Sequence, residues 1–329
     1  ITGVGTHLKF YLEVGGSYYD VTPVRATTTN AATFAATNGS TTLTVTDNSH
    51  GALVGDFVTF SSAASLGGVI TAAILNAEHQ IVSITSANVY TLTSSVAANS
   101  SDSGNGGAAT DAAYQIHVGS DIELPLLGWG AGTWGDGTWG NGGVSATSLR
   151  LWNQSNFGED LVFGYRGGPV YYRDAGDALT VRAALLSSLT DASDVPTVQN
   201  VVVVSDINRF VFCFGANTLG TTVQDPLLVR WSDQENAVNW TPSATNQAGS
   251  LQLSSGSEII AAHQARQAVY IWTNTAMYSL QYVGGQIVWG AQLIGDNISI
   301  ASPNSVVYAN GVSYWMGKGK FYSSNGSQI

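Results

Sequence analysis

The polar and hydrophobic residues in the first third of the chain alternate in short runs. Every second residue is apolar in four stretches rich in Thr, Ser and Val, namely 41–46, 56–60, 80–84 and 89–93. A period of two residues predicts half-buried β-strands, and the Gly and Asn residues between the runs favour turns. The segment 69–77 (VITAAILNA) fits either a helical turn or a strand, and 99–111 (NSSDSGNGGAATD) is predicted to be a polar linker. Residues 26–112 are therefore predicted to form an inserted small β-barrel or β-sandwich domain.

Longer apolar runs recur in the second half of the chain, where pairs of runs flank a short polar turn. These predicted hairpins span residues 160–174, 201–215, 268–284 and 305–326. Their turn centres lie about 41, 67 and 44 residues apart, and a repeat of about 40–50 residues made of strands alone is typical of β-propeller blades. The wide second gap holds residues 225–253, which we interpret as an insertion in one blade. An irregular stack of β-sandwiches is the alternative architecture.

The start of the chain fits the same organisation. Residues 8–25 place two apolar runs around Gly15 and Gly16, which is a hairpin signal. The predicted fold class is therefore all-β, with a β-propeller-like core of repeated antiparallel hairpins. Outside the insert, we assign residues 1–25 as the start of the core and residues 113–148 as a linker with a Trp/Gly-rich loop. Residues 149–329 are assigned as the rest of the core, incomplete at its C-terminus.

A loop of unusual composition lies between the two regions. Residues 128–143 read GWGAGTWGDGTWGNGG, in which Trp129, Trp134 and Trp139 recur every five residues between glycines. This spacing is neither helical nor strand-like, so we predict an ordered loop whose indole rings dock into pockets. A G-x-G-x-x-G pattern also occurs there, but a dinucleotide site needs a following helix, and more glycine follows instead. No cofactor is therefore predicted.

The scarcity of charge narrows the possible functions. Charged residues make up 10% of the chain, against about 25% in an average globular protein. The net charge is −11, and the 11 basic residues form no patch that could neutralise several phosphates, so tight nucleic-acid binding is not expected. No apolar stretch is long enough for a transmembrane helix. The only cysteine, Cys213, lies in an apolar strand and is expected to be a core residue.

No residue pattern predicts a catalytic or metal centre. The five histidines lack metal-ligand spacing, and there is no G-x-S-x-G elbow. Asp233 and Glu235, in RWSDQENAVNW, would share one face of a strand, as the acid pair of a propeller glycosidase could. Because SDQEN is polar and turn-like, we interpret both as solvated loop charges. Together with the three tryptophans of the Gly-rich loop, they are our candidate subunit-interface residues.

Several phrases of the sequence resemble the tail nozzle proteins of short-tailed bacteriophages, a family that includes tail-hub and packaged-DNA stabilisation proteins. The phrases occupy residues 5–25, 149–174, 225–262 and 296–322. The stretch from WSDQEN to SGSEII is the most specific of them. Residues 55–95 are similar to a small β-barrel module found inserted in phage tail proteins, and this similarity is generic.

The resemblance implies a structural protein of the virion tail with a β-propeller core. Such nozzles are homo-hexamers below the portal and adaptor rings, where they retain packaged DNA and conduct it at infection. The implied partners are the adaptor, the portal, other tail proteins and passing double-stranded DNA, without sequence-specific binding. A surface poor in charge suits extensive subunit contacts. A negative lumen would repel the DNA backbone and let it slide, which is our hypothesis for the charge of −11.

Two functions of other classes remain open. The first is a carbohydrate- or receptor-binding tail component, in which Trp129, Trp134 and Trp139 would form an exposed platform for sugar rings. Buried indoles would instead indicate a docking arm. The second is a propeller glycosidase, which would need two carboxylates about 5–10 Å apart in a cleft, one of them with a raised pKa.

Overall fold

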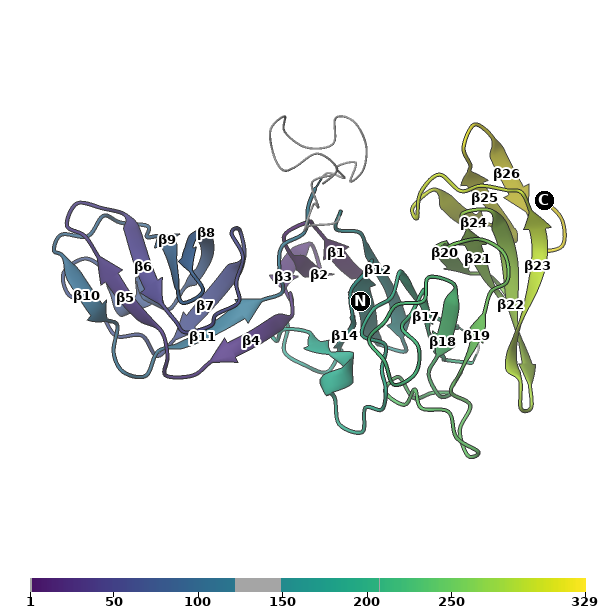
Figure 1. The fold of residues 1–329 in the computed structure, drawn as a ribbon, viewed down its shortest axis with the longest axis horizontal. Helices are drawn as coiled ribbons and strands as arrows, with labels where there is room; N and C mark the ends of the chain where they lie inside the picture. Colours follow the sequence, from purple (N-terminus) through teal and green to yellow (C-terminus); the bar gives the residue numbers. More distant parts are fainter. Residues whose placement is uncertain (1, 122–148, 207) are drawn as a thin grey trace, which may run out of the picture. The chain divides into compact units, whose positions relative to one another are not determined.

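The computed structural model describes residues 2–121, 149–206 and 208–329, and within these ranges the regular structure is almost entirely β. The chain divides into two compact units. One unit, which we call the propeller, comprises Ile1–Val4, Leu12–Tyr19 and Leu151–Ile329. The other, which we call the insert, comprises Gly5–Tyr11 and Asp20–Arg150 (Figure 1). The all-β prediction is confirmed.

The insert is built on one antiparallel sheet in the order β10-β5-β6-β9-β8-β7-β11-β4. Its strands are β4 (Val24–Thr28), β5 (Thr33–Ala36), β6 (Thr42–Thr46), β7 (Phe57–Ser61), β8 (Glu78–Ser86), β9 (Val89–Thr93), β10 (Asp102–Asn105) and β11 (Asp111–Gln115). The alternating sequence decides which side chains are buried, because Leu43 and Val45 of β6 point into the core between more exposed threonines. A short helix, α1 (Ala72–Leu75), forms within the segment 69–77 and buries Leu75.

The Gly-rich stretch 99–111 belongs to this sheet, so the linker prediction for it is wrong. Its residues Asp102–Asn105 form β10, which pairs with β5. Gly106 follows at φ 110°, and a Cβ there would lie 2.5 Å from Cδ2 of Phe34. Only glycine allows both this backbone conformation and this close approach. The glycine content of this stretch alone does not distinguish a closely packed strand from a flexible linker.

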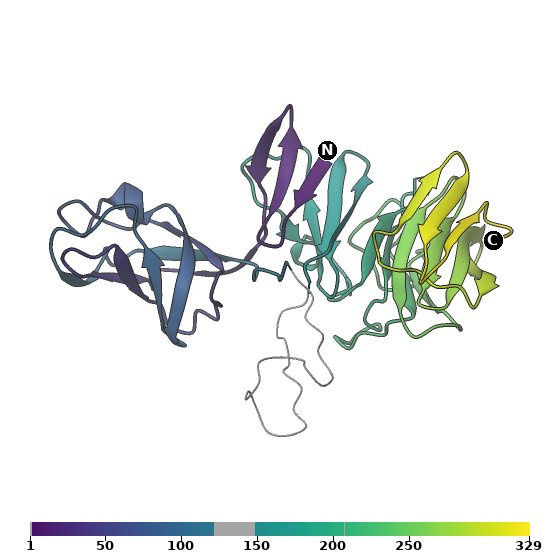
Figure 2. The same cartoon turned by 90° about the horizontal axis from the view of Figure 1, so that it is seen from above.

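The propeller consists, within the described ranges, of five small antiparallel sheets that follow one another in chain order (Figures 1 and 2). The first sheet contains β1 (Thr2–Gly5), β2 (Phe10–Val14) and β3 (Ser17–Asp20). The last sheet contains β24 (Val306–Ala309), β25 (Val312–Met316) and β26 (Phe321–Ser324). The second sheet contains β12 (Trp152–Phe157), β13 (Asp160–Tyr165), β14 (Val170–Arg173) and β15 (Ala184–Leu185). The third contains β16 (Val201–Val204), β17 (Val211–Phe214), β18 (Leu228–Trp231) and β19 (Gly249–Gln252). The remaining sheet contains β20 (Ile259–Gln264), β21 (Val269–Thr273), β22 (Ala276–Gly284) and β23 (Val288–Asp296), and a 3-10 turn, η1 (Leu186–Ser188), follows β15.

Strands in the middle of the propeller are buried on both faces, which explains their continuous apolar sequences. All four valines of β16 are buried. Val201 and Val203 join a core shared with the following sheet, whereas Val202 and Val204 join a core shared with the preceding one. Face-to-face stacking of successive sheets is the architecture of propeller blades. The propeller prediction is confirmed, and the alternative of stacked sandwiches is wrong.

Side chains tie the first strands of successive sheets together. The Asn153 side chain of β12 accepts a hydrogen bond from the Val202 amide at 2.7 Å, and the Ser155 hydroxyl accepts one from the Val204 amide at 3.1 Å. One sheet further on, the Asn200 side chain donates to the Ile259 carbonyl at 3.1 Å. These bonds satisfy backbone groups on strand edges that have no neighbouring strand of their own sheet.

The predicted insertion at 225–253 is wrong in its main part. Residues Leu228–Trp231 and Gly249–Gln252 are β18 and β19, the third and fourth strands of their blade. Only residues 232–248 form a long connection between them. The gap between hairpin turns is wide because this connection is long, while the blade itself has the same strand number as its neighbours.

Candidate functional site

Asp233 and Glu235 lie in the connection between β18 and β19, and they have different environments. The Asp233 Oδ1 atom accepts hydrogen bonds from the Gln234 and Gln247 amides, both at 2.8 Å, so this carboxylate organises the loop. Glu235 is exposed at φ 54°, and its amide donates to the Arg209 carbonyl at 3.0 Å. The turn-like interpretation of SDQEN fits this geometry. Their role as subunit contacts stays a prediction.

The other candidate contacts, Trp129, Trp134 and Trp139, lie outside the described residues. The expectations that their indoles dock and that they form a sugar platform therefore both stay predictions. The same holds for the expectation that the chain has no catalytic residues. Among the described residues, no group of three or more His, Cys, Asp or Glu side chains could hold a metal ion. No described helix combines the length and the apolar character needed to span a bilayer.

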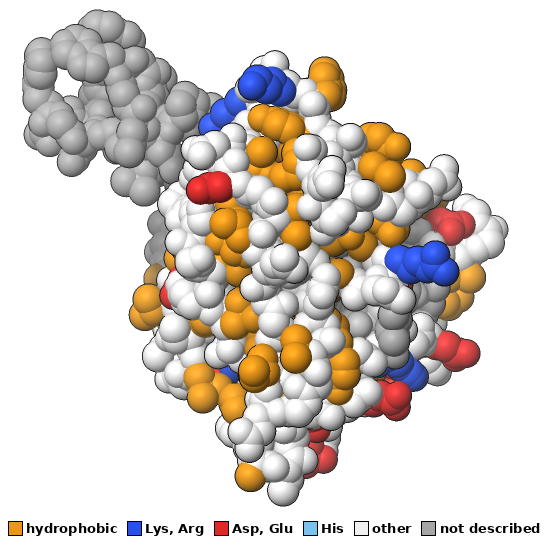
Figure 3. Space-filling model, turned by 90° about the vertical axis from the view of Figure 1, so that its right-hand side faces the viewer, with side chains coloured by type: hydrophobic (Ala, Val, Ile, Leu, Met, Phe, Trp, Pro, Cys, Tyr) orange, Lys and Arg blue, Asp and Glu red, His pale blue; other side chains and the backbone are white. Residues whose placement is uncertain are grey.

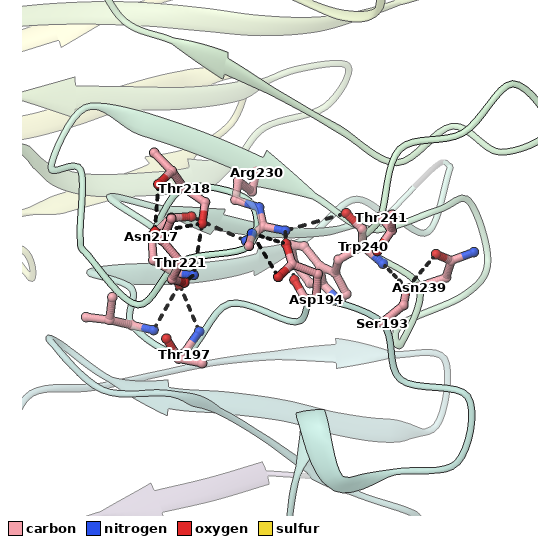
Figure 4. Close-up of polar contacts among 12 residues, drawn as sticks. Ser193, Asp194, Thr197, Asn217, Thr218, Thr221, Arg230, Asn239, Trp240 and Thr241 are labelled. Carbon is pink, nitrogen blue, oxygen red and sulfur yellow. Dashed lines mark hydrogen bonds and ion pairs between the residues drawn. The ribbon is translucent and has the colours of Figure 1, made fainter.

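A buried arginine lies at the base of the β18–β19 connection (Figure 4). Arg230 is 1% exposed, and its Nη2 atom lies 2.7 Å from both the Oδ2 atom and the carbonyl oxygen of Asp194. Its Nη1 atom donates to the Asn217 carbonyl at 3.3 Å, and Nη2 also reaches the Trp240 carbonyl at 3.5 Å. A buried guanidinium needs such partners because its desolvation is otherwise unfavourable.

This network holds three loops against one strand. The Asn217 Oδ1 atom accepts from the Thr197 amide at 2.9 Å, and its Nδ2 atom donates to the Thr221 carbonyl at 2.6 Å (Figure 4). Cys213 pairs with Arg230 across β17 and β18 and is fully buried, as the sequence predicts. Burial raises the pKa of the Cys213 thiol far above its usual value, although Arg230 acts in the opposite direction. This cluster therefore has a structural role.

A pocket of about 270 Å³ lies where the first strands of the propeller sheets meet, and we call it the axial pocket. Its lining comes from β12, β20, the turn between β13 and β14, and the starts of β16 and β24 with the residues just before them. No Asp or Glu is among the described residues that line it. The polar and aromatic side chains in this lining are Trp152, Asn153, Arg166, Asn200, His263 and Asn304.

Three of these side chains already serve the fold. Asn153 and Asn200 bind the backbone of the neighbouring sheet. Arg166 forms an ion pair with Glu258 at 3.0 Å and donates to the Ile260 carbonyl at 3.2 Å. The guanidinium in the pocket wall is therefore neutralised by the protein itself.

His263 and Asn304 are the polar side chains with capacity for a ligand. Neither forms a side-chain hydrogen bond to another described residue, and the His263 ring lies 5.8 Å from that of Tyr308. Burial lowers the pKa of His263, although Asp206 acts in the opposite direction, so the imidazole is neutral at physiological pH. The sequence does not reveal this pocket, because its residues come from separate blades. Asn200, directly before the four valines of β16, is a weak signal for it.

The last sheet has an apolar face that no described residue covers. Its side chains are Val307, Tyr314, Met316 and Phe321, which are 58%, 48%, 45% and 84% exposed. The register places Val307 opposite Tyr314 and Met316 opposite Phe321, so all four lie on one face. We call it the open face. Figure 3, seen from the side of the C-terminal strands in Figure 1, shows apolar side chains gathered with few charges among them.

No family model matches the chain, and no curated protein matches it. Among solved structures, the phage phi92 endosialidase is similar, with 12% sequence identity and a TM-score of 0.29. The similarity covers 94% of this chain and 48% of that one, so this chain spans about half the length of the endosialidase chain.

Proposed function

We propose that the chain is a structural component of a short-tailed bacteriophage tail, and thus part of the virion. The observation that carries the proposal is the set of phrases that resemble tail nozzle proteins, because these phrases include strands of all five described propeller sheets. The open face supports it, since an apolar sheet face in water favours assembly with another surface.

The test is the location of the chain in the phage that encodes it. Antibodies against the recombinant chain are expected to label the tail of purified particles in immunogold electron microscopy, and the chain is expected in the tail fraction by mass spectrometry. Absence from purified particles, with strong signal in infected cells, would refute the proposal.

Within that role, the axial pocket favours recognition of carbohydrate on the host surface. Sugar sites combine an apolar ring with side chains that both donate and accept hydrogen bonds, and Trp152, His263 and Asn304 supply these groups. The recombinant chain is expected to bind polysaccharide extracted from the host envelope in a pull-down. Equal retention on polysaccharide from a resistant host would contradict this function.

The open face favours a second candidate, a nozzle subunit that contacts a second copy of this chain. A hexameric ring would bury the open face and present a net negative lumen to DNA. Met316→Asp places a charge at the centre of this face, and it is expected to reduce the oligomer mass in light scattering. Val223→Asp is the matched control, because Val223 is 72% exposed in a loop elsewhere. A wild-type monomer, or an oligomer that Met316→Asp leaves intact, would exclude this interface.

A further inference from the structure

We infer that the axial pocket takes a single uncharged sugar ring and discriminates against acidic sugars. The inference rests on the carbohydrate function proposed above and specifies its ligand class. Its first support is size. Pockets for drug-sized ligands begin at about 300 Å³, so a pocket of about 270 Å³ suits one ring with its substituents better than an oligosaccharide.

The second support is the charge balance of the wall. Arg166 is the only cation among the described Lys and Arg residues that line the pocket, and the Glu258 carboxylate holds it at 3.0 Å. The carbonyls of Ile259 and Ile260 occupy further guanidinium donors, at 3.4 and 3.2 Å. An acidic sugar would have to displace Glu258 or bring its carboxylate into the pocket without a counter-charge, and either is unfavourable.

The third support is the chemistry of the side chains that remain for a ligand. A neutral imidazole and a carboxamide each offer a donor and an acceptor, which matches the hydroxyls of a sugar. Asn304 is exposed and His263 is partly buried in β20, so the two groups lie at different depths of the pocket lining. Trp152 adds an apolar wall, and its ring packs against that of Tyr165 at 5.6 Å.

Saturation-transfer NMR with the whole chain, using glucose, N-acetylglucosamine, glucuronic acid and sialic acid, tests this inference. At least one neutral sugar is expected to give saturable binding, and the acidic sugars are expected to bind much more weakly. Asn304→Ala and His263→Ala should each weaken the neutral sugar about threefold to tenfold, as for the loss of one hydrogen bond. Tight binding of sialic acid by the wild-type chain would overturn the inference.

Glu258→Gln provides the sharper experiment, because it predicts a gain. Removing the carboxylate takes away the negative charge that lies 3.0 Å from the Arg166 guanidinium, so acidic sugars are expected to bind about tenfold more tightly, as for a new charge-assisted hydrogen bond. Glu159→Gln, at an exposed turn, makes the same change in net charge and is expected to bind like the wild type. No gain in Glu258→Gln would contradict the charge argument.

The outcomes separate this inference from the proposed functions. If the Asn304 and His263 variants bind host polysaccharide as well as the wild-type chain does, the axial pocket is not the binding site. The proposed carbohydrate recognition would then still stand. If neither polysaccharide nor any sugar binds, both carbohydrate proposals fail. The tail location would still stand on its own evidence from purified particles.

Discussion

The insert and the propeller use opposite sequence patterns to bury their strands. In the insert, β6 and β9 alternate between Thr and an apolar residue, and each strand gives one face to a single core. In the propeller, β16, β17 and β21 are buried at every position. Their alternate side chains enter the cores on either side of the sheet. A continuous apolar strand therefore marks a sheet packed between two neighbouring sheets, whereas an alternating strand marks a sheet that packs on a single core.

Core truncation should have the largest effect and should separate the two regions. Phe212→Ala, in the core shared by two blades, and Phe60→Ala, in the insert, each remove a ring that is nearly fully buried. Each is expected to destabilise its own unit by about 3–5 kcal/mol. In calorimetry, two unfolding transitions are expected, with only the propeller transition shifted by Phe212→Ala and only the insert transition shifted by Phe60→Ala.

A single transition that both variants shift equally would contradict this expectation, because it would mean that the two units unfold together. Val223→Ala is a surface control, since Val223 is 72% exposed in a loop away from the open face and its loss should change neither transition by more than about 0.5 kcal/mol.

Removal of the buried charge should have the next largest effect. Arg230→Met keeps an unbranched stem in place of the aliphatic part of arginine but removes the guanidinium, so the Asp194 carboxylate loses its cation. Loss of one partner of a buried pair costs about 3–5 kcal/mol, and we expect the low end because the Asp194 side chain is 25% exposed. Urea unfolding followed by tryptophan fluorescence gives the value. Arg266→Met, at an exposed position, is the control, and equal loss in both variants would argue against a network effect.

The insert contains a smaller counterpart of this network. The Tyr114 hydroxyl donates to Oδ2 of buried Asp47 at 2.6 Å and lies 2.9 Å from the Tyr90 hydroxyl. Burial raises the pKa of Tyr114 and that of Tyr90, so both stay protonated. Tyr114→Phe is expected to cost about 1–3 kcal/mol because Asp47 loses a donor.

Tyr90→Phe removes a hydrogen bond between two neutral groups, so its cost should be smaller, about 0.5–1.5 kcal/mol. The free energies of unfolding in urea decide the order of the two variants. A larger loss in Tyr90→Phe would show that Asp47 does not depend on Tyr114.

The pH dependence of the insert should be the smallest effect. Burial alone would raise the pKa of Asp56, but hydrogen bonds from His117 and from the Leu53 and Val118 amides outweigh it and hold the pKa below 3.8. Since the folded pKa is lower than the unfolded one, Asp56 stabilises the insert above about pH 4, and this contribution is lost as the pH falls through the folded value.

Urea midpoints of the insert transition at about pH 5 and about pH 3 measure this loss. Asp56→Asn should flatten the profile at the acidic end. An unchanged slope in that variant would assign the acid sensitivity to other carboxylates.

Much of the fold could be predicted from the sequence because it depends on local pattern. The hairpin at Gly15 and Gly16 and the strands of the insert follow from alternation and turn residues. The predictions failed where tertiary packing decides the outcome. Gly106 has the sequence context of a linker glycine, and only the close approach of Phe34 in the fold explains it. The wide spacing at 225–253 suggested an insertion, although two blade strands lie within it.

The candidate site was less accessible to prediction, for a different reason. His263 and Asn304 belong to different blades, and only the stacking of the sheets brings them to one pocket. Asp233 could be interpreted correctly as a loop residue because the loop is local. When the partners of a polar residue lie on the next repeat, the sequence around that residue contains almost no information about them.

The first and last strands of the insert are neighbours, and this has a consequence for how such a protein can change. β4 and β11 pair antiparallel, with Gln115 opposite Val24, and the Ile116 amide donates to the Pro23 carbonyl at 3.0 Å. The chain therefore leaves the sheet of the insert beside the point where it enters that sheet. A domain with adjacent ends can be exchanged or deleted as one unit by recombination, with a short turn in its place, while the blades keep their order.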